Sequence, residues 1–328
     1  MYESFYGLSA KPFQLKPDPH FFYGSKGHKR AMAYLEYGLS QGEGFIVITG
    51  EVGAGKTTLM RNLFSKLEAN RIHAAQIVNT HVDSEDILRM VAGAFGIAVQ
   101  GASKADVLMR LETFLRQCDG QGKRALLVVD EAQNLTPRAV EELRMLSNFQ
   151  TDDKALLQTF LLGQPEFREI LLSGNMQQLL QRVTATYHLG PLDPLETKAY
   201  IEHRLHTVGW KDDPRLNDDA FSLIHDFSGG IPRKINSLCD RLFLMGYLEE
   251  IHQFTAAEVN AVISDIQQEF TLPANVAAAA APATPAQEMI PHEFAENIDE
   301  RLSRMERSVV SALDAIKRLL QSSGSRNR

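Results

Sequence analysis

The chain has 328 residues, of which 44% are hydrophobic and 23% are charged. These fractions are close to those of soluble globular proteins, so they exclude a wholly disordered chain, and the length suits two or three domains. The formal net charge of −7 excludes a protein that coats nucleic acid through bulk positive charge, although a local basic patch stays open. Cys118 and Cys239 lie far apart without metal-ligand spacing, so we expect two inert thiols in a reducing compartment.

No stretch of the sequence predicts a membrane span or a signal peptide. The longest apolar runs, at 45–48 and 125–129, are far shorter than the roughly 20 residues that a membrane helix needs. The first residues also lack the basic stretch and apolar run of a secretory signal. We therefore expect a soluble, cytoplasmic protein that reaches a membrane only indirectly.

The first two regions of the chain differ in composition and in the pattern of their apolar residues. Residues 1–43 are rich in aromatic residues and proline and end in a helical pattern, whereas short β-branched runs alternate with amphipathic segments over 44–192. We expect strands at 45–49, 75–79, 125–129 and 157–162, and helices at 57–69, 84–95, 104–118 and 137–149. Such alternation predicts an α/β fold, with a parallel sheet covered by helices on both faces.

The strand pattern ends near residue 193. Residues 193–270 predict a small all-helical domain, with helices at 195–209, 219–229, 232–250 and 255–270. An Ala/Pro-rich stretch at 271–291 is typical of a semi-stiff linker, and we expect a disordered tail at 322–328.

Between linker and tail, residues 292–321 predict an amphipathic helix. Its apolar residues alternate spacings of four and three, which is a heptad pattern, at Ile298, Leu302, Met305, Val309, Ala312, Ile316 and Leu319. We expect a coiled coil or a helix that docks on a partner. The alternative is a lone amphipathic helix that folds back on its own domain.

One motif predicts a chemical function by its spacing. The pattern G-x-x-x-x-G-K-[ST] is matched without deviation between an expected strand and an expected helix, by Gly50, Glu51, Val52, Gly53, Ala54, Gly55, Lys56 and Thr57, with Thr58 directly after. The backbone N–H groups of such a loop converge on phosphates, at the positive end of the following helix. We expect Lys56 to reach the β- and γ-phosphates of ATP and Thr57 to ligate Mg²⁺.

A second motif supplies two carboxylates. Asp130 and Glu131 follow the expected strand at 125–129, where a buried charge is costly unless it meets a partner or a metal. We expect Asp130 to hold Mg²⁺ through water and Glu131 to polarise the attacking water. The alternative role for the carboxylates, capping the next helix, is filled by Thr136.

Both motifs and several further stretches resemble the AAA+ superfamily, and more closely its ATPases of the general secretion pathway protein A type (ExeA-like). The resemblance covers about residues 1–270 and rests on FYGLSAKPFQLKPDPHFFYGSKGHKRAMAYLEYGL, GEVGAGKTT, LLVVDEAQNL, LLGQPEFREIL and SGGIPRKIN. Within that group the chain is most similar to the subfamily encoded beside exosortase (PEP-CTERM) and exopolysaccharide loci. The resemblance implies a P-loop AAA+ core over 44–192 and a helical lid over 193–270.

The resemblance also implies three polar site residues. Gln164 is similar to sensor 1, between the γ-phosphate and the attacking water, with a polar strand terminus as the alternative. Arg182 resembles an arginine finger that reaches the neighbouring subunit's γ-phosphate, with a surface ion pair as the alternative. Arg233, after the turn Gly229–Pro232, resembles sensor 2 and would contact phosphate from the lid.

The N-terminal segment 1–43 would lie on the adenine side of the nucleotide, with Tyr23, His28 and Ala31 near the base. A metal-dependent hydrolase unrelated to nucleotides is disfavoured, since His203 and His206 have ligand spacing but no evident third ligand.

The resemblance implies an ATPase that uses ATP and Mg²⁺, changes conformation on hydrolysis and serves a secretion, exopolysaccharide-export or exosortase-associated system. We expect self-association into an oligomer and a protein partner of that machinery bound through the C-terminal helix, which would place the chain at the periphery of the inner membrane. We do not expect nucleic acid as a partner. Two alternatives stay open: a DNA-associated ATPase of the transposition-helper kind, and a slow nucleotide-gated scaffold.

Overall fold

Residues 1–68, 70–78, 84–152, 154–173 and 176–270 are described by the structure, a computed structural model. Met1–Phe270 form one compact unit. The predicted linker, the heptad helix with its apolar residues from Ile298 to Leu319, and the tail lie outside the described residues. Among the described residues, every helix is too short or too polar to cross a membrane.

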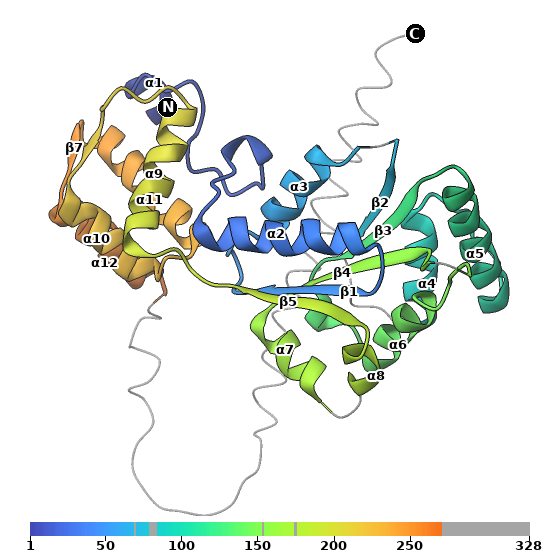
Figure 1. Ribbon diagram of the computed structural model, residues 1–328. Coiled ribbons are helices and arrows are strands. Elements are labelled where there is room, and N and C mark those ends of the chain that lie inside the picture. The colour runs from blue at the N-terminus through green and yellow to red at the C-terminus, as the bar shows by residue number, and fades with distance from the viewer. Residues whose placement is uncertain (69, 79–83, 153, 174–175, 271–328) are drawn as a thin grey trace, which may run out of the picture. The chain divides into compact units, whose positions relative to one another are not determined.

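A sheet of five parallel strands forms the centre of the larger lobe, in the order β2-β3-β4-β1-β5 (Figure 1). Its strands are β1 Phe45–Gly50, β2 Ile72–Ile77, β3 Arg124–Val129, β4 Leu157–Gly163 and β5 Val183–Leu189. Four of them were predicted, the second with bounds shifted toward the N-terminus. The fifth was not predicted, because β5 is an edge strand whose side chains alternate between exposed and partly buried and lack a buried apolar run.

Helices cover both faces of the sheet, as the β1 side chains show. Ile46 and Ile48 pack into a core cluster with α2 Lys26–Gln41 and α3 Lys56–Lys66. Phe45 and Val47 point to the opposite cluster, which contains residues of α4 Ser84–Ala94, α5 Lys104–Gly120, α6 Pro137–Leu146, α7 Pro165–Leu172 and α8 Gln177–Leu180. The predicted α/β fold with a helix-covered parallel sheet is therefore confirmed.

The four predicted C-terminal helices are also present. They are α9 Pro194–Thr207, α10 Asp218–Ser228, α11 Pro232–Leu248 and α12 Ala256–Phe270. The expectation of a region without strands was wrong, because two-residue strands, β6 Arg215–Leu216 and β7 Gln253–Phe254, pair in parallel between these helices. Below, these helices are called the lid.

The N-terminal aromatic residues belong to the core of the lid rather than to the sheet. Helix α1 Tyr2–Phe5 lies beside α11 (Figure 1), and the 3₁₀ helix η1 spans Pro19–Phe21. Five residues of this segment are buried with lid residues in one cluster: Tyr2, Tyr6, Leu8, Phe13 and Phe21. The predicted segment 1–43 thus divides, since its later part, helix α2, packs on the sheet.

Candidate functional site

The glycine-rich loop runs from the end of β1 into α3 and needs two of its glycines for steric reasons. Gly53 and Gly55 have φ angles of +86° and +99°, a region that residues with a Cβ rarely adopt. A Cβ on Gly53 would lie 2.4 Å from Cβ of Arg233, and one on Gly55 would lie 2.8 Å from Nε2 of His28. The loop is therefore shaped by the backbone and packed tightly on both sides.

Lys56 supplies the positive charge of this loop and is buried. Its Nζ donates hydrogen bonds to the carbonyl oxygens of Gly50, at 2.6 Å, and Glu51, at 3.0 Å. Burial lowers the pKa of Lys56, against the opposing effect of Glu131 and Asp130. A compact cation beside converging backbone N–H groups is an arrangement that binds phosphate oxygens.

Thr57 and Asp130 meet beside the loop. Oγ1 of Thr57 donates a 2.9 Å hydrogen bond to Oδ2 of Asp130, whose side chain is only 2% exposed. Burial raises the pKa of Asp130, and the hydrogen bond from Thr57 opposes that rise. A buried carboxylate and a hydroxyl are oxygen ligands that suit Mg²⁺, which usually takes its other ligands from water and substrate phosphates. The described residues include no group of three or more His, Cys, Asp or Glu that could hold a metal.

Glu131 is the second residue after β3 and caps the start of the 3₁₀ helix η2 Ala132–Asn134, with a φ angle of +54°. Its Oε2 accepts hydrogen bonds from Nε2 of Gln133, at 2.6 Å, and from Nε2 of Gln164, at 3.1 Å. Burial raises the pKa of Glu131, but these two donors and the charge of Lys56 outweigh it, so the pKa is lowered. The carboxylate is thus held ionised in a fixed orientation.

Gln164 reaches Glu131 because β3 and β4 are neighbours in the sheet. It follows the last residue of β4 and precedes α7. Its backbone N–H donates to Oε1 of Gln133 at 3.0 Å, so the two glutamines and Glu131 form one network. The structure therefore brings the predicted pair together and adds Gln133, which the sequence analysis missed although it stands two residues after Glu131.

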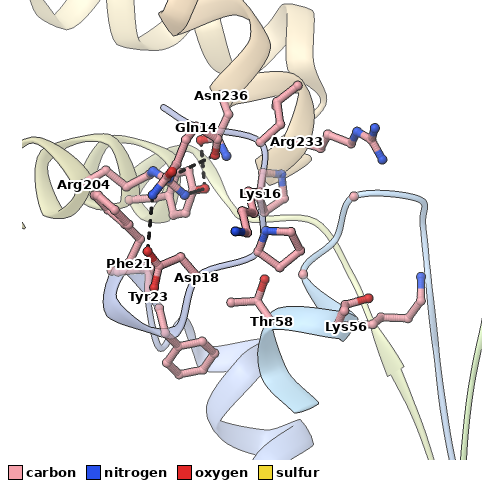
Figure 2. A pocket seen from close by; sticks show the side chains of 18 of the residues that line it. Gln14, Lys16, Asp18, Phe21, Tyr23, Lys56, Thr58, Arg204, Arg233 and Asn236 are labelled. Carbon is pink, nitrogen blue, oxygen red and sulfur yellow. Dashed lines mark hydrogen bonds between the residues drawn. The ribbon is translucent and has the colours of Figure 1, made fainter. Parts of the chain in front are cut away.

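Arg233 is the second residue of α11 and lies over the loop. Its backbone N–H donates to the carbonyl oxygen of Gly53 at 3.2 Å, so the lid contacts the loop at its turn. Figure 2 shows Arg233 and Lys56 at one end of the cavity, and Phe21 and Tyr23 at the other. Arg233 is thus placed with the loop residues at one end of a shared cavity.

The cavity extends from the loop to the N-terminal segment. Its predicted lining residues are Val52, Gly53, Gly55, Lys56, Thr57, Thr58, Glu131, Tyr23, His28 and Arg233, and its unpredicted ones include Gln14, Lys16, Asp18, Phe21, Tyr200, Arg204 and Asn236. Ala31, expected near the base, is fully buried in the core cluster on the sheet and does not line it. His28 is buried, its ring nitrogens 2.7 Å from Oγ of Ser25 and 3.1 Å from the carbonyl oxygen of Ala54.

Arg182 is not brought to this cavity. It is exposed and precedes β5 at the amino end of the strand, whereas the loop follows the carboxyl end of the parallel strand β1. Its guanidinium Nη1 donates to the carbonyl oxygen of Ser147 at 3.2 Å and to Oγ at 3.0 Å. The ion pairs among the described residues do not include Arg182, so the alternative of a surface ion pair is not seen there.

The cysteines and the paired histidines lie outside the cavity. Cys118 and Cys239 are buried, free thiols whose pKa is raised by burial, as expected of inert residues. His203 packs against Tyr23, and His206 packs against Trp210.

Comparison with known proteins gives this arrangement a family context. An AAA domain model matches residues 39–171. General secretion pathway protein A of Aeromonas hydrophila is 38% identical over 275 residues, which are 83% of this chain and 50% of that protein. The chain therefore spans about half the length of this relative.

Solved structures share the fold at low sequence identity. Cdc6p of Pyrobaculum aerophilum has a TM-score of 0.59 and 18% identity, over 80% of this chain and 74% of its own. The ORC1 protein of Aeropyrum pernix in complex with DNA gives 0.58 and 16%, over 79% and 70%. The RuvB Holliday junction branch migration motor of Thermotoga maritima gives 0.50 and 20%, over 74% and 70%. These findings show that the chain contains an AAA domain and is homologous to general secretion pathway protein A over 275 residues, and that it shares its fold with the solved structures.

Proposed function

We propose that the chain is a Mg²⁺-dependent ATPase whose hydrolysis drives lid movement in a secretion machine. The single observation that carries the proposal is the meeting of Lys56, Thr57 and Glu131 at one end of the cavity, with Asp130 hydrogen-bonded to Thr57. Thr57 and Asp130 would hold Mg²⁺, which neutralises charge on the phosphate oxygens when bound. Lys56 and the backbone N–H groups of Gly50–Thr58 would bind the phosphates.

Glu131 is the residue we assign to water activation. Its lowered pKa keeps it ionised at neutral pH, as a residue that accepts a proton from water must be. Gln164, hydrogen-bonded to the same carboxylate, would orient the attacking water or contact the γ-phosphate, since its amide can both donate and accept.

Arg233 links the chemistry to motion. Its backbone contacts Gly53 and its side chain lines the cavity. A guanidinium at this position would stabilise charge on the γ-phosphate. Loss of that phosphate would then remove a contact between lid and loop, which is how we propose that hydrolysis changes the conformation.

Arg182 acts between subunits in this proposal. Its place at the amino edge of the sheet, remote from the loop of its own chain, supports a contact with the phosphate of a neighbouring copy. The chain would then be an oligomer with sites completed in trans, because a guanidinium supplied by another subunit stabilises the transition state.

The homology to general secretion pathway protein A supports a role in secretion. We propose the narrower setting of exopolysaccharide export or an exosortase-associated system from the resemblance of the sequence. A partner would bind the heptad helix at 292–321, so that a cytoplasmic ATPase acts at the inner membrane through that partner. One basic lid residue is not available to a DNA backbone, because Arg204 is buried.

The decisive experiment measures ATP turnover per protomer over a wide range of protein concentrations, for the wild type and Arg182→Ala. We expect the specific activity of the wild type to rise with concentration and that of Arg182→Ala to stay flat. Arg144→Ala, which removes an ion pair with Glu141 outside the cavity, is the matched control and should behave as the wild type.

A flat, very low rate at every concentration would contradict the oligomeric motor and favour the slow nucleotide-gated scaffold. A rise that persists in Arg182→Ala would leave the oligomer in place and overturn the role of Arg182. Absence of Mg²⁺-dependent ATP turnover under all conditions would overturn the proposed function itself.

A further inference from the structure

One buried charge lies at the far end of the cavity from the phosphate loop. Arg204, on lid helix α9, is only 6% exposed. The ion pairs found among the described residues do not include it. A buried cation is strongly destabilising unless its N–H groups are satisfied, so the groups that compensate this one indicate what it does.

The compensating groups come mostly from the N-terminal segment. The guanidinium donates to the carbonyl oxygens of Pro12 and, at 3.2 Å, Gln14. Its centre also lies 4.6 Å from the centroid of the Phe21 ring, a cation–π distance. Arg204 therefore ties a segment that precedes it by about 190 residues to the lid.

The tied segment is a wall of the cavity. Figure 2 shows Gln14, Asp18, Phe21 and Tyr23 on the side of the cavity away from Lys56, with Arg204 beside them. Nε2 of Gln14 donates to Oδ2 of Asp18 at 3.3 Å, which braces the wall internally. Because Lys56 marks the phosphate end, this wall faces the nucleoside part of a bound nucleotide.

Arg204 also connects the wall to the helix that carries Arg233. Its Nη1 donates to the Tyr200 hydroxyl at 3.0 Å, and that hydroxyl donates to Oδ1 of Asn236 at 2.9 Å. Asn236 follows Arg233 on α11 and lines the same cavity. A continuous set of contacts thus runs from the nucleoside wall through Arg204 to the residue over the phosphate loop.

We propose that Arg204 is a positioning residue that fastens the nucleoside-side wall to the lid, so that wall and Arg233 move as one body. The proposal rests on the nucleotide-binding function assigned to this cavity. Its consequence is that Arg204 supports binding of the nucleoside part of ATP and contributes nothing to binding of the phosphates alone.

Two ligands separate these contributions. ATP uses both ends of the cavity, whereas inorganic tripolyphosphate uses only the phosphate end. The ratio of their affinities, measured by calorimetry for the full chain with Mg²⁺, should fall roughly tenfold or more in Arg204→Ala, a change equivalent to losing about one charge-assisted hydrogen bond. Tripolyphosphate affinity should stay within about twofold of the wild type.

Two milder variants keep the proposal testable if Arg204→Ala fails to fold. Arg204→Lys keeps the charge but loses the planar fork that serves three acceptors, and Tyr200→Phe removes only the hydroxyl between Arg204 and Asn236. Both should lower the affinity ratio by less than Arg204→Ala does. Arg241→Ala, which removes an exposed lid arginine, should leave the ratio unchanged.

An unchanged ratio in all three variants, or equal losses for both ligands, would overturn the proposal and make Arg204 a residue of general lid stability. A wild-type protein that binds neither ligand would overturn the nucleotide function first, and this inference with it.

Discussion

The two ends of the cavity are built in different ways. The phosphate end uses consecutive residues, Gly50–Thr58, which follow β1, together with Asp130 and Glu131, which follow β3 at the same edge of the sheet. The nucleoside end is assembled from the first residues of the chain and from the lid, joined by Arg204 across about 190 residues. A contiguous motif fixes the chemistry locally, whereas the nucleoside end depends on the lid being folded and in place.

The largest expected effect, on affinity, comes from a substitution that disrupts the phosphate end alone. Lys56→Ala removes the buried cation, and a charge-assisted contact to phosphate contributes about 1.5–3 kcal/mol, so affinity should fall roughly 100-fold for both ATP and tripolyphosphate. Titration calorimetry of both ligands measures this. In contrast to Arg204→Ala, the ratio of the two affinities should change little.

Lys66→Ala, on the exposed end of the same helix, is the control for Lys56→Ala. Retained tight ATP binding by Lys56→Ala would contradict the assignment of the phosphate end.

The second effect separates binding from chemistry within the phosphate end. Glu131→Gln removes the proton acceptor but keeps the shape of the side chain, so turnover should fall roughly 10²- to 10⁴-fold with ATP affinity unchanged. Steady-state turnover and calorimetry measure the two quantities. Glu141→Gln, an exposed carboxylate, is the control, and near-normal hydrolysis by Glu131→Gln would mean that another group activates the water.

The smallest expected effect concerns the pH dependence of turnover, and it tests one hydrogen bond at the phosphate end. Gln133→Ala removes a hydrogen bond that lowers the pKa of Glu131, so that pKa should rise. Because Glu131 acts in its ionised form, activity is lost as pH falls through this pKa. The acid limb of the turnover profile should therefore move to higher pH.

The same profile for Gln117→Ala, an exposed glutamine of α5, should match the wild type. An acid limb at the wild-type position in Gln133→Ala would show that Gln133 does not tune Glu131.

The phosphate end could be predicted from the sequence because its geometry follows from one motif and because parallel strands place their carboxyl ends at one edge of a sheet. Lys56, Thr57 and Asp130 lie together as such motifs require. Gln164 also reaches Glu131, which only the order of strands β3 and β4 allows. The roles assigned to these residues stay predictions until they are tested.

The nucleoside end could not be predicted because its contacts have no local pattern. Arg204 reads as one of several basic residues on an amphipathic helix, and only the fold shows that carbonyl groups of Pro12 and Gln14 surround it. Strand β5 was missed for a related reason, since its side chains alternate between exposed and partly buried and lack the apolar run that identified the other four strands. Long-range packing, rather than local secondary-structure propensity, determines both the contacts of Arg204 and the formation of β5.

The aromatic residues at the start of this sequence have a consequence for folding during translation, because the residues on which they pack are made much later. The Tyr2 hydroxyl donates to Asp240 at 2.6 Å, and Tyr6 and Phe13 pack on Phe243, so these three residues are made long before the residues on which they pack. At about 5–20 residues per second, roughly 12–50 s pass before α11 is made. The sheet can form in that interval while the N-terminal aromatic side chains are still without their core, which makes this segment a natural client for chaperones during translation.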